Sequence, residues 1–268
     1  MLKRIASAAI GIILLILVFF WGNLVMINIA VTAVALLALW EFYHAFKQKE
    51  IRPYEMLGYV VTLSILAIGF IPNALIKVFL FVIMPIILFI MFCSSVLTNM
   101  KRNVVDIAVT ILGLIYVSFF FSFIAFICHI EHGLYYIWYV FGGAWMTDTF
   151  AFFIGSKFGK HKFTQISAKK SIEGCIAGVV GCAIFYAAYT FYLNSIGLEI
   201  NLILMTFIGI IVSIISQIGD LAASSIKRYC GVKDFGNIMP GHGGALDRFD
   251  SVIMIAPFIY MLFQFIVI

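Results

Sequence analysis

Residues 5–21 read IASAAIGIILLILVFFW. A helix needs roughly 20 mainly apolar residues to cross the hydrocarbon core of a bilayer, and this run approaches that length. It follows Met1-Leu-Lys-Arg, as the apolar part of a signal peptide would. No small-residue cleavage site comes after it, however, and a second apolar run begins almost at once. We therefore predict that 5–21 is the first transmembrane helix.

The composition supports many such helices. Of the 268 residues, 64% are hydrophobic and only 11% are charged. A soluble domain is about a quarter charged, so this chain has too few charges to build a water-facing surface. The formal net charge of +5 then indicates loop charge that orients helices in a membrane, not a surface for nucleic acid. The five cysteines form no CxxC pair and are expected to be buried thiols.

The apolar runs predict an all-α fold, a polytopic transmembrane bundle of nine helices. The predicted spans are 5–21, 24–44, 55–71, 74–96, 104–128, 133–156, 173–194, 201–224 and 249–267. Gly22-Asn23 joins the first two spans, and Pro72-Asn73 joins the third and fourth. We expect one continuous membrane domain, with an N-terminal bundle at 1–130 and a catalytic region at 131–268.

The basic residues fall on one side of this bundle. All of the 17 lysines and arginines except Lys77 precede the first span or follow an even-numbered one. The positive-inside rule makes that side cytoplasmic, which places the N-terminus inside and the C-terminus outside. With one span more or fewer, the basic residues would no longer fall on one side. The one-sided distribution therefore supports nine spans. The expected location is the cell (inner) membrane, with the long loops at 157–172 and 225–248 in the cytoplasm.

The acidic residues divide by position. Glu41, Glu50 and Glu55 lie near a cytoplasmic connection, where we expect a solvated interface. Asp106 begins a helix, where a carboxylate suits the N-terminal dipole. Asp148 lies within an apolar run, about 13 Å below its cytoplasmic end at 1.5 Å per residue. A carboxylate at that depth usually faces a cavity or a partner, and a structural pair with a lysine is the alternative.

A polar stripe follows in the eighth span. Asp220, Ser224, Lys227 and Arg228 are spaced i, i+4, i+7 and i+8, so on a helix they share one face. A carboxylate, a hydroxyl and two cations on one face suit a site for a metal ion and phosphates. A snorkelling helix end would explain Lys227 and Arg228 but not Asp220.

The next segment, residues 233–250, reads KDFGNIMPGHGGALDRFD and has four glycines and a proline within nine residues. Such a loop can present backbone N–H groups to phosphate. Asp247 and Asp250, beside Arg248, would share a helix face and hold a divalent cation with hard oxygen ligands. His242 is a candidate base or phosphate donor. An ordinary flexible loop with a charged helix start is the alternative.

The loop before the seventh span reads SAKKSIEG over residues 167–174. Ser171 is placed to cap the helix that follows. Lys169 and Lys170 could bind a lipid phosphate or a nucleotide, or could simply be attracted to anionic headgroups.

Together these residues carry a family resemblance. Ser224-Ser-Ile-Lys227-Arg228, followed after four residues by the 233–250 segment, resembles the signature of phosphatidate cytidylyltransferases, also called CDP-diglyceride synthases. Gly219-Asp220-Leu, the 167–174 segment and the stretch from Asp148 to Gly155 also fit. The resemblance covers the last half of the chain, and the first spans match only in being hydrophobic. Ala223 stands where many members have glutamate, so we expect no ligand there.

The resemblance implies a reaction in which CTP and phosphatidic acid give CDP-diacylglycerol and pyrophosphate, with one or two Mg²⁺ ions as cofactor. Asp220, Asp247 and Asp250 are the implied metal ligands, and Lys227 and Arg248 join Asp220 and Asp247 as catalytic residues. The implied substrate-binding residues are Ser167, Lys169, Lys170, Ser224, Arg228, Lys233, His242, Gly243, Gly244, Asp148 and Glu173. The expected partners are CTP, phosphatidic acid and membrane lipids, without nucleic acid, and a homodimer is left open.

Other functions fit parts of the pattern. A CTP-dependent lipid kinase of the polyprenol type would share parts of the motif but attack the γ-phosphate of the nucleotide. A membrane transporter would cluster its ionisable groups at mid-membrane, whereas these lie largely at one face. A CDP-alcohol phosphotransferase would carry a DGxxAR motif followed by widely spaced aspartates, which this sequence lacks.

Overall fold

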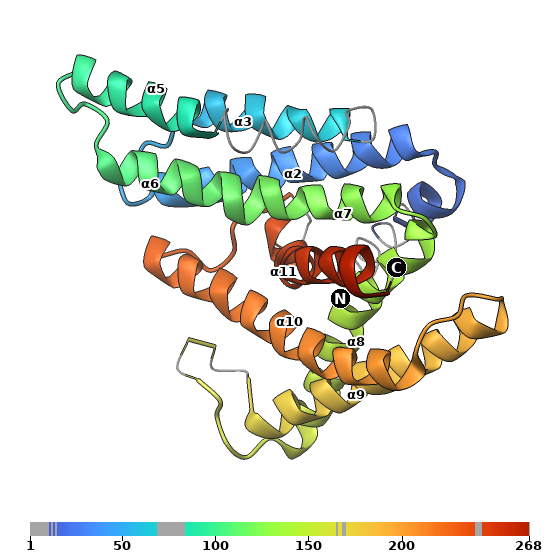
Figure 1. Cartoon of the computed structure of the whole chain (residues 1–268). Helices are drawn as coiled ribbons and strands as arrows, with labels where there is room; N and C mark the ends of the chain where they lie inside the picture. Colours follow the sequence, from blue (N-terminus) through green and yellow to red (C-terminus); the bar gives the residue numbers. More distant parts are fainter. Residues whose placement is uncertain are drawn as a thin grey trace. The chain divides into compact units, whose positions relative to one another are not determined.

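The computed structural model describes residues 11, 13, 15–68, 84–164, 166–167, 170–238 and 243–267. Pro72-Asn73, Lys77 and much of the first and fourth predicted spans lie outside these residues. The all-α prediction is confirmed: the described residues contain no strand, only an isolated β-bridge between Lys162 and Ser171. Figure 1 shows the helices in chain order.

The helices follow the predicted spans closely. They are α2 (Leu24–Lys47), α3 (Glu55–Leu63), the 3₁₀ helix η1 (Ser64–Ala67), α5 (Met84–Leu97), α6 (Val104–Gly113), the π-helix η3 (Leu114–Phe119), α7 (Phe120–His129), α8 (Gly133–Phe158), α9 (Ile172–Ser195), α10 (Leu202–Cys230), α11 (Leu246–Leu262) and the π-helix η4 (Phe263–Val267). The main differences are that α10 continues beyond 224 to Cys230 and that α11 begins at Leu246, before 249.

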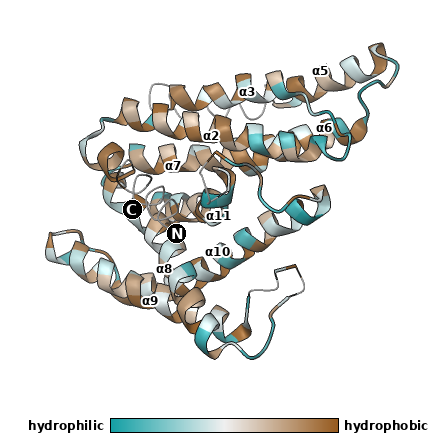
Figure 2. Cartoon of the chain, turned by 180° about the vertical axis from the view of Figure 1, so that it is seen from behind, coloured by the Kyte–Doolittle hydropathy of each residue, from teal (hydrophilic) through white to brown (hydrophobic). Residues whose placement is uncertain are grey.

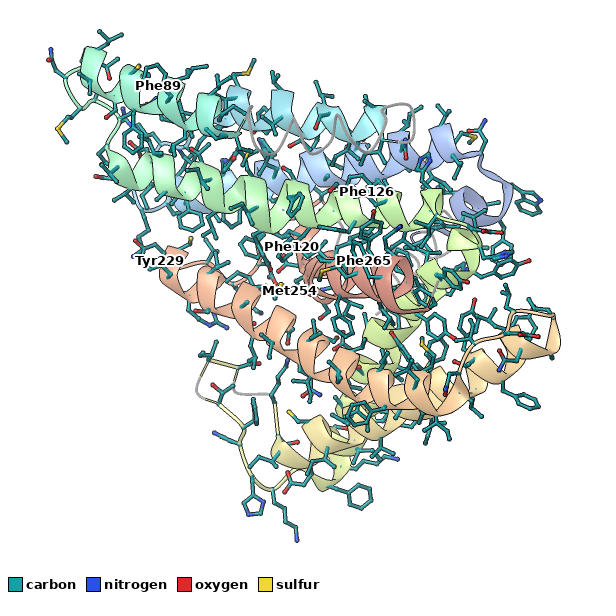
Figure 3. All side chains as sticks on the ribbon, viewed as in Figure 1. Phe89, Phe120, Phe126, Tyr229, Met254 and Phe265 are labelled. Atoms are coloured by element: carbon teal, nitrogen blue, oxygen red, sulfur yellow. The ribbon has the colours of Figure 1, made fainter. Side chains whose placement is uncertain are left out.

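The helices are suited to lipid. Four helical segments are long and apolar enough to cross a membrane, namely Leu24–Lys47, Val104–His129, Ile172–Ser195 and Leu202–Cys230. Hydrophobic residues occupy many helical turns in Figure 2. Many large apolar side chains are exposed. Phe89 on α5, labelled in Figure 3, is 67% exposed. The chain is a multi-pass membrane protein, and the number of spans and the sides of the termini stay predictions.

The chain forms two compact units. The first comprises 1–129 and 230–248, and the second comprises 130–229 and 249–268. The glycine-rich segment after α10 therefore belongs with the N-terminal helices, and the boundary between the units passes through the first turn of α11. The catalytic assignment of 131–268 stays a prediction.

In the first unit, α2 is the helix against which the others pack. The Tyr43 ring of α2 fits against Gly58 and Gly113, where a Cβ atom would lie 2.7 Å from the Tyr43 hydroxyl or 2.5 Å from its ring. The hydroxyl donates to the Thr110 carbonyl oxygen at 3.0 Å. Asp106 forms a capping box with Asn103 at the start of α6, which confirms the predicted helix start.

In the second unit, α8 and α9 pack at close range through small residues. A Cβ atom on Gly174 would lie 2.8 Å from the Ala151 carbonyl oxygen, and one on Gly178 would lie 2.9 Å from that of Thr147. In lipid, no hydrophobic effect drives helices together. Small residues let transmembrane helices approach closely, so van der Waals contacts between them stabilise the pair. This packing fixes the two helices that flank the 159–171 loop.

Candidate active site

The two ends of the segment between α8 and α9, residues 161–163 and 170–172, pair as the arms of a hairpin. The Phe163 amide donates to the Lys170 carbonyl oxygen at 2.9 Å, and the Ile172 amide donates to that of His161 at 2.9 Å. Glu173 closes the base of the hairpin, because its carboxylate contacts His161 Nδ1 at 2.7 Å. Ser171 accepts a hydrogen bond from the Gly174 amide, so the predicted cap of α9 is confirmed.

The hairpin holds Lys170 against α10. Lys170 Nζ lies 2.6 Å from Asp220 Oδ2 and donates to the Gln217 carbonyl oxygen at 3.2 Å. Gln217 in turn donates to the Cys175 carbonyl oxygen of α9 at 3.2 Å. The ion pair is only partly exposed, with 18% of the Lys170 side chain and 32% of the Asp220 side chain accessible. Residues 50 positions apart therefore form one polar site at the cytoplasmic end predicted for α10.

Three carboxylates of the second unit interact electrostatically. The charges of Asp220 and Lys227 on α10, and of Asp148 on α8, act on the carboxyl group of Asp250. Asp250 is 7% exposed and its Oδ1 accepts the Ser251 amide at 2.7 Å. Close carboxylates repel one another, and nearby cations offset that repulsion. Lys170 and Lys227 supply two of them.

The glycine-rich segment in the first unit is folded around carboxylates. Asp247 Oδ2 accepts the Phe235 amide at 2.8 Å and the Gly244 amide at 3.0 Å. Glu41 of α2 accepts the Ala245 amide on Oε1 and the Leu246 amide on Oε2, both at 2.9 Å. These four amides have acceptors within the chain, so in this conformation they are not available to a phosphate as the sequence suggested.

The remaining predicted residues occupy more open positions. Ser224 and Ser167 are half-buried, and Arg228, Lys233 and Arg248 are exposed. Gly243 has a φ of +88°, the left-handed region that glycine adopts at no steric cost. Lys169 and His242 lie outside the described residues.

The described residues hold no preformed group of three or more metal-binding side chains. Asp220 faces Lys170, Asp247 faces two amides, and Asp250 faces the Ser251 amide. The donor chemistry nevertheless fits magnesium, because Mg²⁺ prefers carboxylate oxygens and takes only one or two of them alongside water and substrate phosphates.

Comparison with known proteins agrees with this chemistry. The model of the cytidylyltransferase family matches residues 2–266, nearly the whole chain. The chain belongs to the cytidylyltransferase family. Among its relatives, a phosphatidate cytidylyltransferase of Staphylococcus haemolyticus is 39% identical over 175 residues, 65% of each chain. One of Bacillus subtilis is 39% identical over 153 residues, 56% of each chain. The chain thus spans 65% of the length of the staphylococcal relative and less of the other.

This member of the cytidylyltransferase family also has a buried carboxylate that the sequence analysis placed wrongly. Glu41 was expected at a solvated interface, but its side chain is completely buried. The signal was present, because Glu41 lies inside the predicted span 24–44, as Asp148 lies inside its own. An ionisable group within a span is a candidate for function by default. Its nearness to the end of the span favoured the wrong interpretation.

Proposed function

We propose that this protein is a phosphatidate cytidylyltransferase, which transfers CMP from CTP to phosphatidic acid and releases pyrophosphate. The observation that carries the proposal is the ion pair of Lys170 with Asp220, together with the electrostatic interaction of Asp148, Asp220 and Lys227 with Asp250, in a member of the cytidylyltransferase family. The names of the relatives support the choice of phosphatidic acid as the acceptor.

In the proposed reaction, a phosphate oxygen of phosphatidic acid attacks the α-phosphorus of CTP. The bond from the α-phosphorus to the oxygen that bridges to the β-phosphate breaks, and pyrophosphate leaves with that oxygen. The attacking phosphate is already anionic, so no strong general base is needed. Both reactants are negatively charged, and the main task of the protein is to screen their repulsion and align them.

The residues around Asp220 suit this task. Asp220 and Asp250, with Asp148 nearby, would hold Mg²⁺, which when bound polarises the α-phosphate and neutralises charge on the leaving group. Lys170, which pairs with Asp220, would be placed to contact a phosphate of CTP. Lys227 lies about two turns after Asp220 on the same face of α10 and would be placed to contact another. Glu173 and His161 keep the hairpin that carries Lys170 in place.

The proposed orientation follows from charge and substrate. CTP is a soluble cytoplasmic nucleotide, and the loops that carry Lys170 and Lys227 are predicted on the cytoplasmic side. Phosphatidic acid presents its headgroup at the same interface. We therefore place the active site at the cytoplasmic face of the cell membrane.

The test uses the purified protein in phosphatidate-containing detergent micelles with CTP labelled either at the α- or at the γ-phosphate. We expect the α-label in lipid and the γ-label in pyrophosphate, both dependent on Mg²⁺. A lipid kinase would instead put the γ-label in lipid and release CDP, and that outcome would reject the proposal.

A matched pair of variants locates the site. Asp220→Asn is expected to lower kcat by on the order of 100-fold or more, the usual cost of losing one group that stabilises transition-state charge. Glu199→Gln makes the same carboxylate-to-amide change at an exposed position in a predicted outer loop, and it should keep wild-type activity. Full activity of Asp220→Asn would show that the metal assignment is wrong.

A further inference from the structure

Glu41 is a wholly buried carboxylate in the apolar helix α2, with no exposed surface. Its two oxygens accept hydrogen bonds from two consecutive backbone amides, those of Ala245 and Leu246, more than 200 positions later in the chain. Burying a carboxylate is costly unless strong donors surround it. Such a group in a membrane helix requires an explanation beyond packing.

The two amides belong to the start of α11. The first N–H groups of a helix have no acceptor within the helix and need a cap. The residue before α11 is Ala245, whose side chain cannot accept a hydrogen bond. Glu41 therefore caps α11 from another helix, and the positive end of the α11 dipole favours its negative charge.

The loop is shaped around the Glu41 carboxyl group. A Cβ atom on Gly236 would lie 2.3 Å from Glu41 Oε1, and one on Gly244 would lie 2.3 Å from Oε2. Next to Glu41, the Phe42 ring packs against Phe235 with ring centroids 6.4 Å apart. Polar and apolar contacts from one helix thus hold both arms of the loop.

The held segment is the one that carries predicted site residues. Asp247 closes the loop on itself through the Phe235 and Gly244 amides, and Arg248 follows it directly. If the peptide groups of Ala245 and Leu246 changed direction, the first turn of α11 would rotate. Asp247 and Arg248 would move with it.

We propose that Glu41 is a positioning residue of the active site, which orients Asp247 and Arg248 by fixing the backbone at 244–246 without contacting substrate. The inference rests on the proposed function and on the prediction from the sequence that Asp247 is a metal ligand and that Asp247 and Arg248 are catalytic residues. Misplacement by about 1 Å of groups that align reactants can cost roughly 100-fold in rate. Glu41 should therefore affect kcat more than substrate affinity.

The test compares Glu41→Gln with Thr32→Val. Glutamine keeps the shape of Glu41 but turns an N–H group toward one of the two amides, so one hydrogen bond becomes a repulsive contact between donors. Thr32→Val is the control, because it removes a buried hydroxyl of the same helix that, among the described residues, bonds only to the Asn28 carbonyl oxygen. Any general loosening of α2 should appear in both variants.

Two readouts are needed. Amide hydrogen exchange of the purified protein, without CTP or Mg²⁺, should accelerate at least tenfold at 244–246 in Glu41→Gln and remain within twofold in α9. In the labelled-CTP assay, kcat should fall at least tenfold while KM for phosphatidic acid changes less than threefold. Thr32→Val should change neither readout beyond twofold.

The outcomes separate the two proposals. Wild-type protein that forms no CDP-diacylglycerol refutes the proposed function. Active wild type with unchanged exchange at 244–246, or with unchanged kcat, in Glu41→Gln refutes the positioning role. Glu41→Asp offers a milder test, because it keeps the charge but retracts the carboxylate by one methylene, and its kcat should fall as well. If neither variant yields folded protein, Glu41 is needed for folding and the positioning role is also refuted.

Discussion

A single added methyl group at Gly244 tests the geometry of the Glu41 contact. In Gly244→Ala the new Cβ atom would lie 2.3 Å from Glu41 Oε2, whereas ordinary contact begins at 3.4 Å. The carboxyl group must therefore retreat by 3.4 − 2.3 = 1.1 Å. Its two hydrogen bonds of 2.9 Å would lengthen toward 2.9 + 1.1 = 4.0 Å, beyond hydrogen-bonding range.

The expected cost follows from those two bonds. Hydrogen bonds to a charged group contribute about 1.5–3 kcal/mol each, so losing both costs roughly 3–6 kcal/mol. The φ angle of Gly244 is not in the left-handed region. Alanine there restricts the unfolded chain and returns about 0.4–1 kcal/mol. We expect the free energy of unfolding to fall by roughly 2–5 kcal/mol, measured by titrating the protein in mixed micelles with a denaturing detergent.

A double-mutant cycle identifies Glu41 as the cause. In a Glu41→Ala background the space that the carboxyl group fills is empty, so Gly244→Ala should cost less than about 1 kcal/mol. Gly11→Ala is the matched control, because no atom of the residues that the structure describes lies within 4 Å of its added Cβ atom. Being within a helix, that change should be neutral or slightly stabilising. Equal losses from Gly244→Ala in both backgrounds would refute the contact.

Three further predictions concern the second unit. Lys170→Gln removes the cation 2.6 Å from Asp220, and kcat/KM for CTP should fall by on the order of 100-fold in the labelled-CTP assay, with full activity contradicting its role. His161→Ala breaks the 2.7 Å contact with Glu173, so trypsin should cut the hairpin faster than in wild type, and unchanged cleavage would show that the contact does not hold it. Gly142→Ala places a Cβ atom 2.1 Å from the Phe185 ring, and this overpacking should lower the unfolding free energy by about 1–3 kcal/mol in mixed micelles, unless the ring turns aside at no cost.

Much of the helical framework could be predicted because each membrane helix is determined by the sequence of its own segment. An apolar run long enough to cross the bilayer leaves few alternatives to helix, since every backbone group must be bonded within the segment. Helix starts were equally local: Asn23, Asn103 and Ser171 each accept an amide at the first turn that follows. The π-helix at Leu114–Phe119 was not predicted, because its apolar sequence has the same pattern as an α-helix.

Site residues could be predicted to lie together only where they share one helix, because helical spacing places them on one face. Asp220, Ser224 and Lys227 share one helix, so their common face followed from i, i+4 and i+7. The ion pair between Lys170 and Asp220 did not follow, because it joins a hairpin to a helix 50 positions later. No periodicity connects such residues, and only the fold brings them together.

Glu41 lies between these cases, because its role follows from the accounting of backbone hydrogen bonds once the start of α11 is known. Every buried N–H group needs an acceptor. A helix that starts after Ala245 has no side chain of its own to accept its first amides, so its cap must come from elsewhere in the chain. The sequence predicted this helix from 249, and it placed Glu41 at a solvated interface although that residue lies inside the predicted span 24–44. Matching the Glu41 carboxylate to the amides of Ala245 and Leu246 therefore required the helix start at Leu246, which only the fold supplied.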